Sequence, residues 1–289
     1  SFGNKILFKI DNEIITTIDI YEEIKFLKTF NPEINNLKEK EILEISKNSI
    51  VRDKIKKIEI LNYIKEVKVE NKFLLKFIKN KYSDIGLNSM ESFENYLNDN
   101  NLDIKIAKEK IAIELIWNDI IFQKFSSKVN INEDLIKEEI LKNSEKKIQK
   151  ELLLSEIVFN VTEKSEFQKK YARIVLDIEQ TGFKNAALIH SISETASSGG
   201  LIGWVKEENL NKVIKNQINE LKKGEHSKAI RTSSGFLIIK VEDTKEYEIK
   251  FDLNSRIEEM IKFKTNEQLN QFSNMYFNKI KKNMIFNDL

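Results

Sequence analysis

The stretch GGLIGW (Gly199–Trp204) decides the fold, together with LLLSEIVF (Leu152–Phe159) before it and KKGE…TSSGFLIIKV (Lys222–Val241) after it. Paired glycines let the backbone turn tightly against a sheet before an aromatic residue. The leading segment is an apolar run of strand character, and an amphipathic helical pattern separates it from the glycines. The trailing segment predicts a turn, a loop and a closing strand. The order therefore predicts a small module in which helices pack on a sheet.

The limits of this module follow from the distribution of glycine. Six of the eight glycines lie between Gly182 and Gly235, where they punctuate short strands and turns. We expect the module to extend from about Lys147 to Glu246. Lysine runs such as Lys146–Lys147 are interpreted as solvated faces, because Ile, Lys and Asn are abundant throughout the chain.

The residues before the module have the period of α-helices. A hairpin is predicted first, from KILFKI and EIITT around the turn-forming pair Asp11–Asn12. A helix follows from Thr17 and ends before Pro32, because the residue before proline disfavours the helical conformation. Apolar residues at three- and four-residue spacing predict one further helix, whose apolar face is made of Val51, Ile55, Ile58, Leu61 and Ile64. Later helices are expected around Phe73 and Phe77, around Phe93 and Leu97, over Ile104–Phe125 and from Asn132 to Lys142.

After the module, the sequence predicts a strand, YEIKF, and then a single helix. Ser255 and Glu258 have the spacing of a capping box at the start of that helix, which we expect to run to about Lys282. The chain as a whole is therefore predicted to be α+β.

Composition excludes several classes of function. The 289 residues include 48 basic and 46 acidic side chains, a balance that argues against a nucleic-acid surface. The chain has no cysteine, so thiolate metal sites and thiol nucleophiles are excluded. No run of about eighteen apolar residues is present, so no membrane span is expected. The two histidines are too far apart to form a metal-binding pattern, and we expect neither metal nor cofactor.

The order of these elements resembles the periplasmic SurA-type chaperones, which carry parvulin-like (PpiC-type) peptidyl-prolyl isomerase domains. KILFKIDNEIITTIDI, IEILNYIKEVKVE (Ile58–Glu70) and the helical segment Ser92–Ile121 are similar to that family, as are GGLIGW and the TSSGF strand. The resemblance implies a helical N-terminal chaperone domain over 1–146 and one inserted parvulin-like domain with an antiparallel sheet over 147–246. A C-terminal strand and helix over 247–289 would pack back on the first domain.

The resemblance also implies which residues occupy the isomerase site. Rotation about an X-Pro bond must overcome a barrier of about 18–20 kcal/mol, and it needs an apolar pocket and a polar set that favours the twisted amide. The catalytic positions of the family fall on Glu156, Ser193, Ser234 and Leu237. The positions of its proline pocket fall on Leu210, Ile214 and Phe236. Both family histidines and the family acid or cysteine are replaced, so the catalytic set is degenerate.

Several of these residues also have plain structural interpretations. Serine favours turns, so Ser234 is more readily a turn residue than a catalyst. Leu210 and Ile214, at helical spacing, favour core positions. Glu156 has no partner carboxylate in the pattern, and one carboxylate forms no acid–base pair.

The two histidines and the tryptophan of the module have structural interpretations as well. His190 is expected to have a hydrogen-bonded structural role, and His226 is expected to be exposed after a Gly-Glu turn. Trp204 is expected to anchor the core of the module.

Two functions stay open at this point. The first is a chaperone that binds unfolded polypeptides, with outer-membrane β-barrel proteins as the clients that the resemblance implies, and with weak or no isomerase activity. The alternative is an active peptidyl-prolyl cis-trans isomerase with an atypical pocket. We favour the chaperone.

The resemblance implies a periplasmic location after removal of a signal peptide, and a membrane-tethered relative is a further possibility. The sequence does not indicate the oligomeric state.

Overall fold

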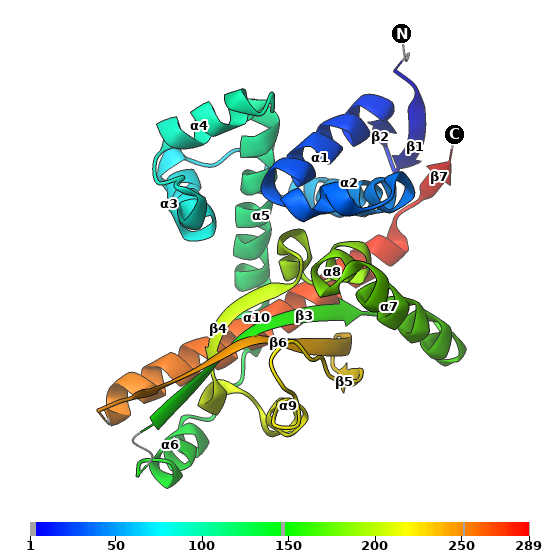
Figure 1. Ribbon diagram of the computed structural model, residues 1–289. Coiled ribbons are helices and arrows are strands. Elements are labelled where there is room, and N and C mark those ends of the chain that lie inside the picture. The colour runs from blue at the N-terminus through cyan, green and yellow to red at the C-terminus, as the bar shows by residue number, and fades with distance from the viewer. Residues whose placement is uncertain (1–3, 146–147, 251, 289) are drawn as a thin grey trace. The chain divides into compact units, whose positions relative to one another are not determined.

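The computed structural model describes residues 4–145, 148–250 and 252–288, which fall into two compact units (Figure 1). Unit 1 comprises the residues up to Lys124 and those from Tyr276 onward, and unit 2 comprises Phe125–Met275. The predicted α+β class is confirmed. The domain joint predicted at 146/147 lies outside the described residues, and the three-part division of the chain stays a prediction.

A three-stranded antiparallel sheet brings the two ends of the chain together in unit 1. Its strands are β1 (Ile6–Ile10), β2 (Glu13–Thr16) and β7 (Phe286–Asp288), in the order β2-β1-β7. The predicted N-terminal hairpin is confirmed: Asp11 turns with φ +50°, a conformation that aspartate tolerates better than most residues. Its side chain also accepts a hydrogen bond from the Ile285 backbone N–H at 2.8 Å.

Helix α1 (Thr17–Phe30) begins and ends where the sequence predicts. The Thr16 hydroxyl accepts from the Asp19 backbone N–H, and the Asp19 carboxylate accepts from the Thr16 N–H at 2.7 Å. This reciprocal capping box satisfies two donors that the first turn leaves without helical partners. The helix stops before Pro32, which opens a short 3₁₀ turn.

Four further helices of unit 1 match the predicted periods, with one correction. They are α2 (Glu39–Ile60), α3 (Asn71–Tyr82), α4 (Met90–Asp99) and α5 (Ile104–Phe125), whose last residue belongs to unit 2. The apolar face predicted through Leu61 and Ile64 is wrong, because α2 ends at Ile60 and Leu61 is 40% exposed. The backbone N–H groups of Tyr63 and Ile64 both bond the Ile60 carbonyl, so the chain turns there. The buried isoleucines of α2 are Ile42, Ile45, Ile50, Ile55 and Ile60.

The last turns of helix α10 (Leu253–Asn283) belong to unit 1 and pack on its helices. The Tyr276 and Phe277 rings lie 5.7 and 6.2 Å from the fully buried ring of Trp117. The Tyr276 hydroxyl donates to the carboxylate of Glu59 on α2. The bond between Glu59 and Tyr276 links the C-terminal helix to α2 across 217 residues of sequence.

Unit 2 is built on a four-stranded antiparallel sheet of order β4-β3-β6-β5. Its elements are α6 (Glu133–Lys142), β3 (Ile148–Phe159), α7 (Phe167–Thr181), α8 (Phe183–His190), β4 (Leu201–Lys206), α9 (Lys212–Ile218), β5 (Ile230–Thr232), β6 (Gly235–Glu248) and α10 as far as Met275. Short 3₁₀ turns lie at Ser126–Lys128, Lys164–Glu166, Glu194–Ser198 and Glu207–Asn209. The predicted α6 is confirmed, with the Asn132 side chain as its N-cap.

Strand alternation gives this sheet two different faces. Ile157, Phe159 and Ile238 point to one face, where α7 and α8 cover them. Leu154, Val158 and their neighbours point to the other face, where α9 and one residue of α10, Phe263, pack. Figure 1 shows α7 and α8 on the opposite side of the sheet from α9.

Gly200, in the decisive stretch, lies where no other residue fits. It has φ +83°, and a Cβ there would run into the Glu156 carbonyl oxygen of β3. The Gly200 carbonyl in turn accepts from the Glu156 N–H at 2.8 Å, so this glycine is part of the β3–β4 junction.

Three local predictions are corrected by the structure. Trp204 does not anchor the core: it is 43% exposed, and the Lys245 ammonium lies 4.2 Å from its ring centroid. His226 is half-buried rather than exposed, because its ring nitrogen bonds the Ser227 carbonyl at 2.9 Å. The cap of α10 is Asp252, not Ser255, because the Asp252 carboxylate accepts from the Ser255 N–H.

Candidate functional site

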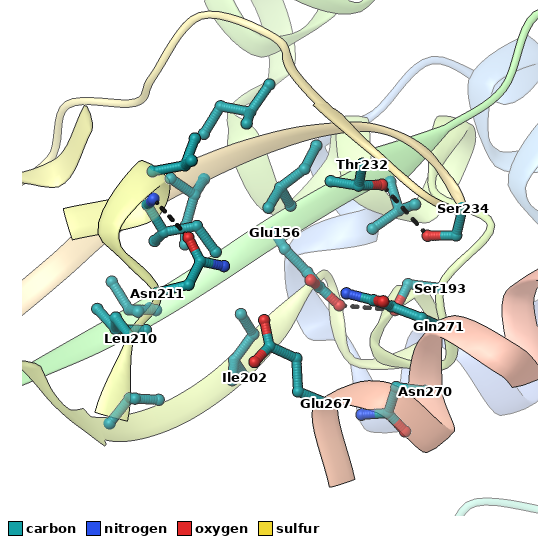
Figure 2. A pocket seen from close by; sticks show the side chains of 18 of the residues that line it. Glu156, Ser193, Ile202, Leu210, Asn211, Thr232, Ser234, Glu267, Asn270 and Gln271 are labelled. Atoms are coloured by element: carbon teal, nitrogen blue, oxygen red, sulfur yellow. Dashed lines mark hydrogen bonds between the residues drawn. The ribbon is translucent and has the colours of Figure 1, made fainter. Parts of the chain in front are cut away.

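A cavity of about 630 Å³ lies in unit 2 on the sheet face opposite α7 and α8 (Figure 2). Its floor is apolar and is formed by β3 and β6, with Leu154, Val158 and Ile239 among its residues. Cavities of this size and lining are typical of binding sites for small molecules or short peptide segments. At the rim, Ile202 and Trp204 of β4 are 39% and 43% exposed, so they offer apolar surface to a ligand.

Glu156 stands on the floor of this cavity, inside a network of hydroxyl groups. The Ser193 hydroxyl donates to Glu156 Oε1 at 2.6 Å, and Thr195 Oγ1 lies 3.0 Å from the same oxygen. Thr195 Oγ1 is also 3.2 Å from Ser193 Oγ. Ser193 is the N-cap of the 3₁₀ turn Glu194–Ser198 and Thr195 lies within it, so this turn brings both hydroxyl groups to Glu156 near the end of β3. Glu156 is therefore bonded by two hydroxyl groups, neither of which is a partner carboxylate.

The pKa of Glu156 is raised above its ordinary value. Burial is the main cause, since a desolvated carboxylate is less stable than the neutral acid. Hydrogen bonds from Ser193 and Thr195 oppose this, and the charge of Glu267 adds to it. A carboxyl group with a raised pKa can donate a hydrogen bond when it is protonated, which an ordinary surface glutamate does not do near neutral pH.

Helix α10 supplies the second wall of the cavity. Asn266, Glu267, Asn270, Gln271 and Asn274 all line it, so one face of the helix is polar where it meets the cavity. In Figure 2 the Glu267 side chain extends from the helix toward Glu156. Burial also raises the pKa of Glu267, against the charge of Lys264 and a hydrogen bond from Asn211.

Two side-chain hydrogen bonds join this helix to the rest of the cavity. Asn211 caps α9 by accepting from the Ile214 N–H at 2.9 Å and also bonds Glu267. The Ser233 hydroxyl donates to Gln271 Oε1 at 2.9 Å. The helix is thus held across the cavity at two points, one near α9 and one near the β5–β6 turn.

The catalytic positions implied by the sequence gather at this cavity. Glu156, Ser193, Ser234 and Leu237 all line it. Ser234 is 7% exposed, in the turn before β6, with its Oγ 3.3 Å from Thr232 Oγ1, so it is both a turn residue and a cavity residue. Leu237 is buried in the core, and an apolar side chain there can neither accept nor donate a proton. Their roles in binding or catalysis stay predictions.

The pocket positions divide between the two faces of the sheet. Leu210, 4% exposed, and the half-buried Ile214 line the cavity while packing on the core, which confirms their core positions, and their role in binding proline stays a prediction. Leu210 follows a 3₁₀ turn, and only Ile214 lies in a helix. Phe236 lies on the opposite face, with its ring 4.5 Å from that of Phe167. Its assignment to the pocket is wrong, because adjacent residues of a strand point to opposite faces.

Sequence reasoning missed Thr195, Asn211 and the residues of α10. One signal was present: Asn266, Asn270 and Asn274 recur every four residues, which places three amides on one helical face. That spacing shows a polar stripe, but it does not show that the stripe faces a cavity more than a hundred residues away in sequence.

His190 has the structural role expected of it. Its Nε2 lies 2.6 Å from Asp177 Oδ2, and Arg173 bonds the same carboxylate oxygen. Burial alone would raise the pKa of Asp177, but these hydrogen bonds and charges outweigh burial and lower it. Across 4–145, 148–250 and 252–288, no group of three or more histidine, aspartate or glutamate side chains could hold a metal ion.

Residues 153–243 match the family model described as rotamase, the PPIC-type PPIASE domain. Among curated proteins, the chain is similar to the chaperone SurA of Pseudomonas aeruginosa, with 25% identity over 163 residues that cover 54% of this chain and 39% of the relative. It is also similar to the SurA of Nitrosococcus oceani, with 28% identity over 169 residues, or 55% and 39% of the two chains. Residues 153–243 thus have the sequence of a parvulin-like domain, and the chain is similar to SurA-type chaperones.

The matched part of this chain spans about two fifths of the length of these relatives. A solved structure from a study of two SurA-like chaperones of Campylobacter jejuni is 15% identical to it, with coverage of 99% of both chains and a TM-score of 0.39. Within the described residues, no helix is both long enough and apolar enough to cross a membrane.

Proposed function

We propose that this chain is a periplasmic chaperone that binds unfolded polypeptides, with weak or no prolyl isomerase activity in its parvulin-like domain. The observation that carries the proposal is the cavity itself: its apolar floor is intact, whereas Leu237 and Glu156 stand where active relatives are expected to have histidines. None of the described residues that line the cavity is a histidine. A pocket of this kind binds apolar side chains without the polar set that isomerisation uses.

Unit 1 supports the same proposal through its surface. Large apolar side chains are exposed on its helices and strands, among them Ile18, Tyr21, Tyr63, Phe73 and Phe122, each 48–61% exposed. Weak apolar contacts at many points suit a protein that holds unfolded chains and lowers the concentration of aggregating species.

The clients follow from the family. The matched relatives bear the name chaperone SurA, and we propose unfolded outer-membrane β-barrel proteins as the client class of this chain as well. The test is aggregation of a urea-unfolded porin after dilution, followed by light scattering. We expect the chain at micromolar concentration to delay aggregation, and no delay over buffer alone would refute the proposal.

An active isomerase with an atypical pocket is the second candidate. One observation favours it: Glu156 has a raised pKa on the floor of the cavity, so its protonated form could donate a hydrogen bond to a twisted amide nitrogen. A protease-coupled assay on X-Pro tetrapeptides separates the two candidates. Under our proposal the rate stays close to the uncatalysed one, a matter of tens to hundreds of seconds at 25 °C.

A Glu156→Gln variant makes this assay sharper. If catalysis is present and depends on the carboxyl group, its rate falls in the variant and rises as the pH falls in the unmodified chain. The matched control is Glu258→Gln on α10, an exposed glutamate that does not line the cavity.

A further inference from the structure

Two carboxyl groups enter the cavity from opposite walls. Glu156 extends from β3 and Glu267 extends toward it from α10 (Figure 2). They lie close enough for the charge of Glu267 to raise the pKa of Glu156. Within the described residues, neither carboxyl group forms an ion pair. Two like charges in a largely apolar cavity are unfavourable unless a cation comes between them.

The basic side chains of the described residues do not fill this position. Lys212 and Arg231 lie at the rim of the cavity with exposed side chains. Lys264 lowers the pKa of Glu267 through its charge, but it stays beyond ion-pair distance. The interior of the cavity therefore keeps two carboxyl groups that face each other without a basic side chain between them.

A second observation concerns the side chain of Asn274, on the helix wall of the cavity. Asn274 lines it and is 6% exposed, yet no described residue forms a hydrogen bond with its side chain. Buried amide groups are almost always hydrogen-bonded, so one that faces a cavity indicates a ligand that completes the bonding. An amide both donates and accepts, which suits the N–H and C=O groups of an extended peptide.

We propose that the cavity binds a client segment in which a lysine or arginine side chain stands beside an apolar one, with the cationic group between Glu156 and Glu267. The proposal rests on the proposed function, because the ligand is part of an unfolded polypeptide. The apolar neighbour lies on the floor near Leu154 and Leu237, and the peptide backbone bonds Asn274. The methylene stem of a basic residue packs on apolar surface while its charge reaches the carboxyl pair.

This arrangement gives the parvulin-like domain a selectivity that an apolar pocket alone does not have. Charge-assisted hydrogen bonds to a carboxylate are shorter and stronger than neutral ones, and they gain strength where water is excluded. Acidic segments are rejected by the same pair, since a third carboxylate adds repulsion. The pocket therefore discriminates by charge among segments of similar hydrophobicity.

The test compares two blocked peptides that differ in one charge. Isothermal titration calorimetry measures the binding of acetyl-Ala-Leu-Lys-Pro-Phe-Ala-amide and of the same peptide with N-acetyl-lysine, with the full chain at low salt. We expect the lysine peptide to bind roughly tenfold more tightly, a difference of about 1.4 kcal/mol. The preference should shrink only slightly in 0.5 M salt, because buried charge pairs are screened much less than exposed ones.

The variants assign this preference to the carboxyl pair. Glu156→Gln combined with Glu267→Gln should reduce the preference below about twofold, whereas Glu258→Gln on the exposed side of α10 should leave it unchanged. Equal affinities for the two peptides, or no binding of either, would overturn the proposal without any variant. A preference that persists in the double variant would overturn it as well.

The porin aggregation assay keeps this proposal distinct from the proposed function. If the unmodified chain delays aggregation but shows no preference for the lysine peptide, the chaperone proposal stands and the charge selectivity fails. If the chain does not delay aggregation but prefers the lysine peptide, the selectivity stands and the chaperone proposal fails.

Discussion

Replacing Gly200 by alanine should weaken unit 2 far more than a comparable change elsewhere. An alanine at φ +83° occupies the left-handed region, which costs roughly 1–2 kcal/mol. Its Cβ would also run into the Glu156 carbonyl oxygen and lie 3.1 Å from the Ala187 methyl group. Forcing extra volume into a packed site adds about 1–3 kcal/mol. The total, about 2–5 kcal/mol, is a large fraction of the stability of a typical domain.

Gly224→Ala is the matched control, because it separates the steric cost from the conformational one. Gly224 has φ +90°, and nothing lies within 4 Å of a Cβ built there. Its substitution should therefore cost only the conformational part, about 1–2 kcal/mol. The two variants share residue type, unit and sign of φ, so their difference measures the contact with β3.

Amide hydrogen exchange by mass spectrometry is the assay, because it reports unit 2 separately from unit 1. Exchange of peptides from β3 and β6 gives the free energy of opening of the sheet. We expect Gly200→Ala to lower this value by at least 1 kcal/mol more than Gly224→Ala does. Equal losses in the two variants would refute the reasoning, since they would show that the β3 carbonyl yields without cost.

Three other changes test the charged groups. Lys110→Met should destabilise unit 1 by about 3–5 kcal/mol, because it leaves Glu23, 5% exposed, without the ammonium group that bonds it at 2.7 Å. The control is Lys105→Met at an exposed position on the same helix, and urea denaturation measures the stability of both variants. Asp177→Asn should cost unit 2 about 1.5–3 kcal/mol above the pKa of the carboxyl group. That loss should fade as the pH drops through this pKa, because the hydrogen bonds and charges that lower the pKa stabilise only the ionised carboxylate. Hydrogen exchange at two pH values measures the change. Glu156→Gln should stabilise unit 2 at pH 7.5 but not near pH 4. The buried ionised carboxylate destabilises the folded state, whereas the neutral acid and the neutral amide do not. Hydrogen exchange of β3 at both pH values shows whether the gain in stability disappears at the lower pH.

The features that the sequence predicted well are those set by neighbouring residues. The Asp11–Asn12 turn, the end of α1 before Pro32 and the Asn132 cap each depend on a backbone preference or a bond within three residues. Such interactions are the same in any tertiary setting. The closing strand and the glycine-rich junction with β3 were predictable for a similar local reason. The φ of Gly200 is one that other residues rarely adopt.

The exposure of a side chain and the sheet face that it occupies depend on partners distant in the sequence, and several predictions of these two properties were wrong. Trp204 was expected in the core because it is large and aromatic, but Lys245 on β6 covers its ring at the surface. Phe236 was placed in the pocket beside Leu237, although neighbours in a strand cannot share a face. Nothing in the sequence near Glu156 indicated Glu267, because only the path of α10 across unit 2 brings the two together.

The cavity of unit 2 has walls of two different origins, and this affects where its function should be sought. The floor comes from the parvulin-like segment at residues 153–243, which matches the rotamase family model. The polar wall comes from α10, which lies outside that match and continues into unit 1. The polar chemistry of the cavity therefore does not depend on the floor alone, because Glu267 and Asn274 add a carboxyl and an amide from the helix. A ligand that bonds both walls would tie the parvulin-like sheet to the helix that ends among the N-terminal helices. Peptide binding in unit 2 should then slow hydrogen exchange in α10 as well as in β3, whereas a ligand held by the floor alone would protect β3 without protecting the helix.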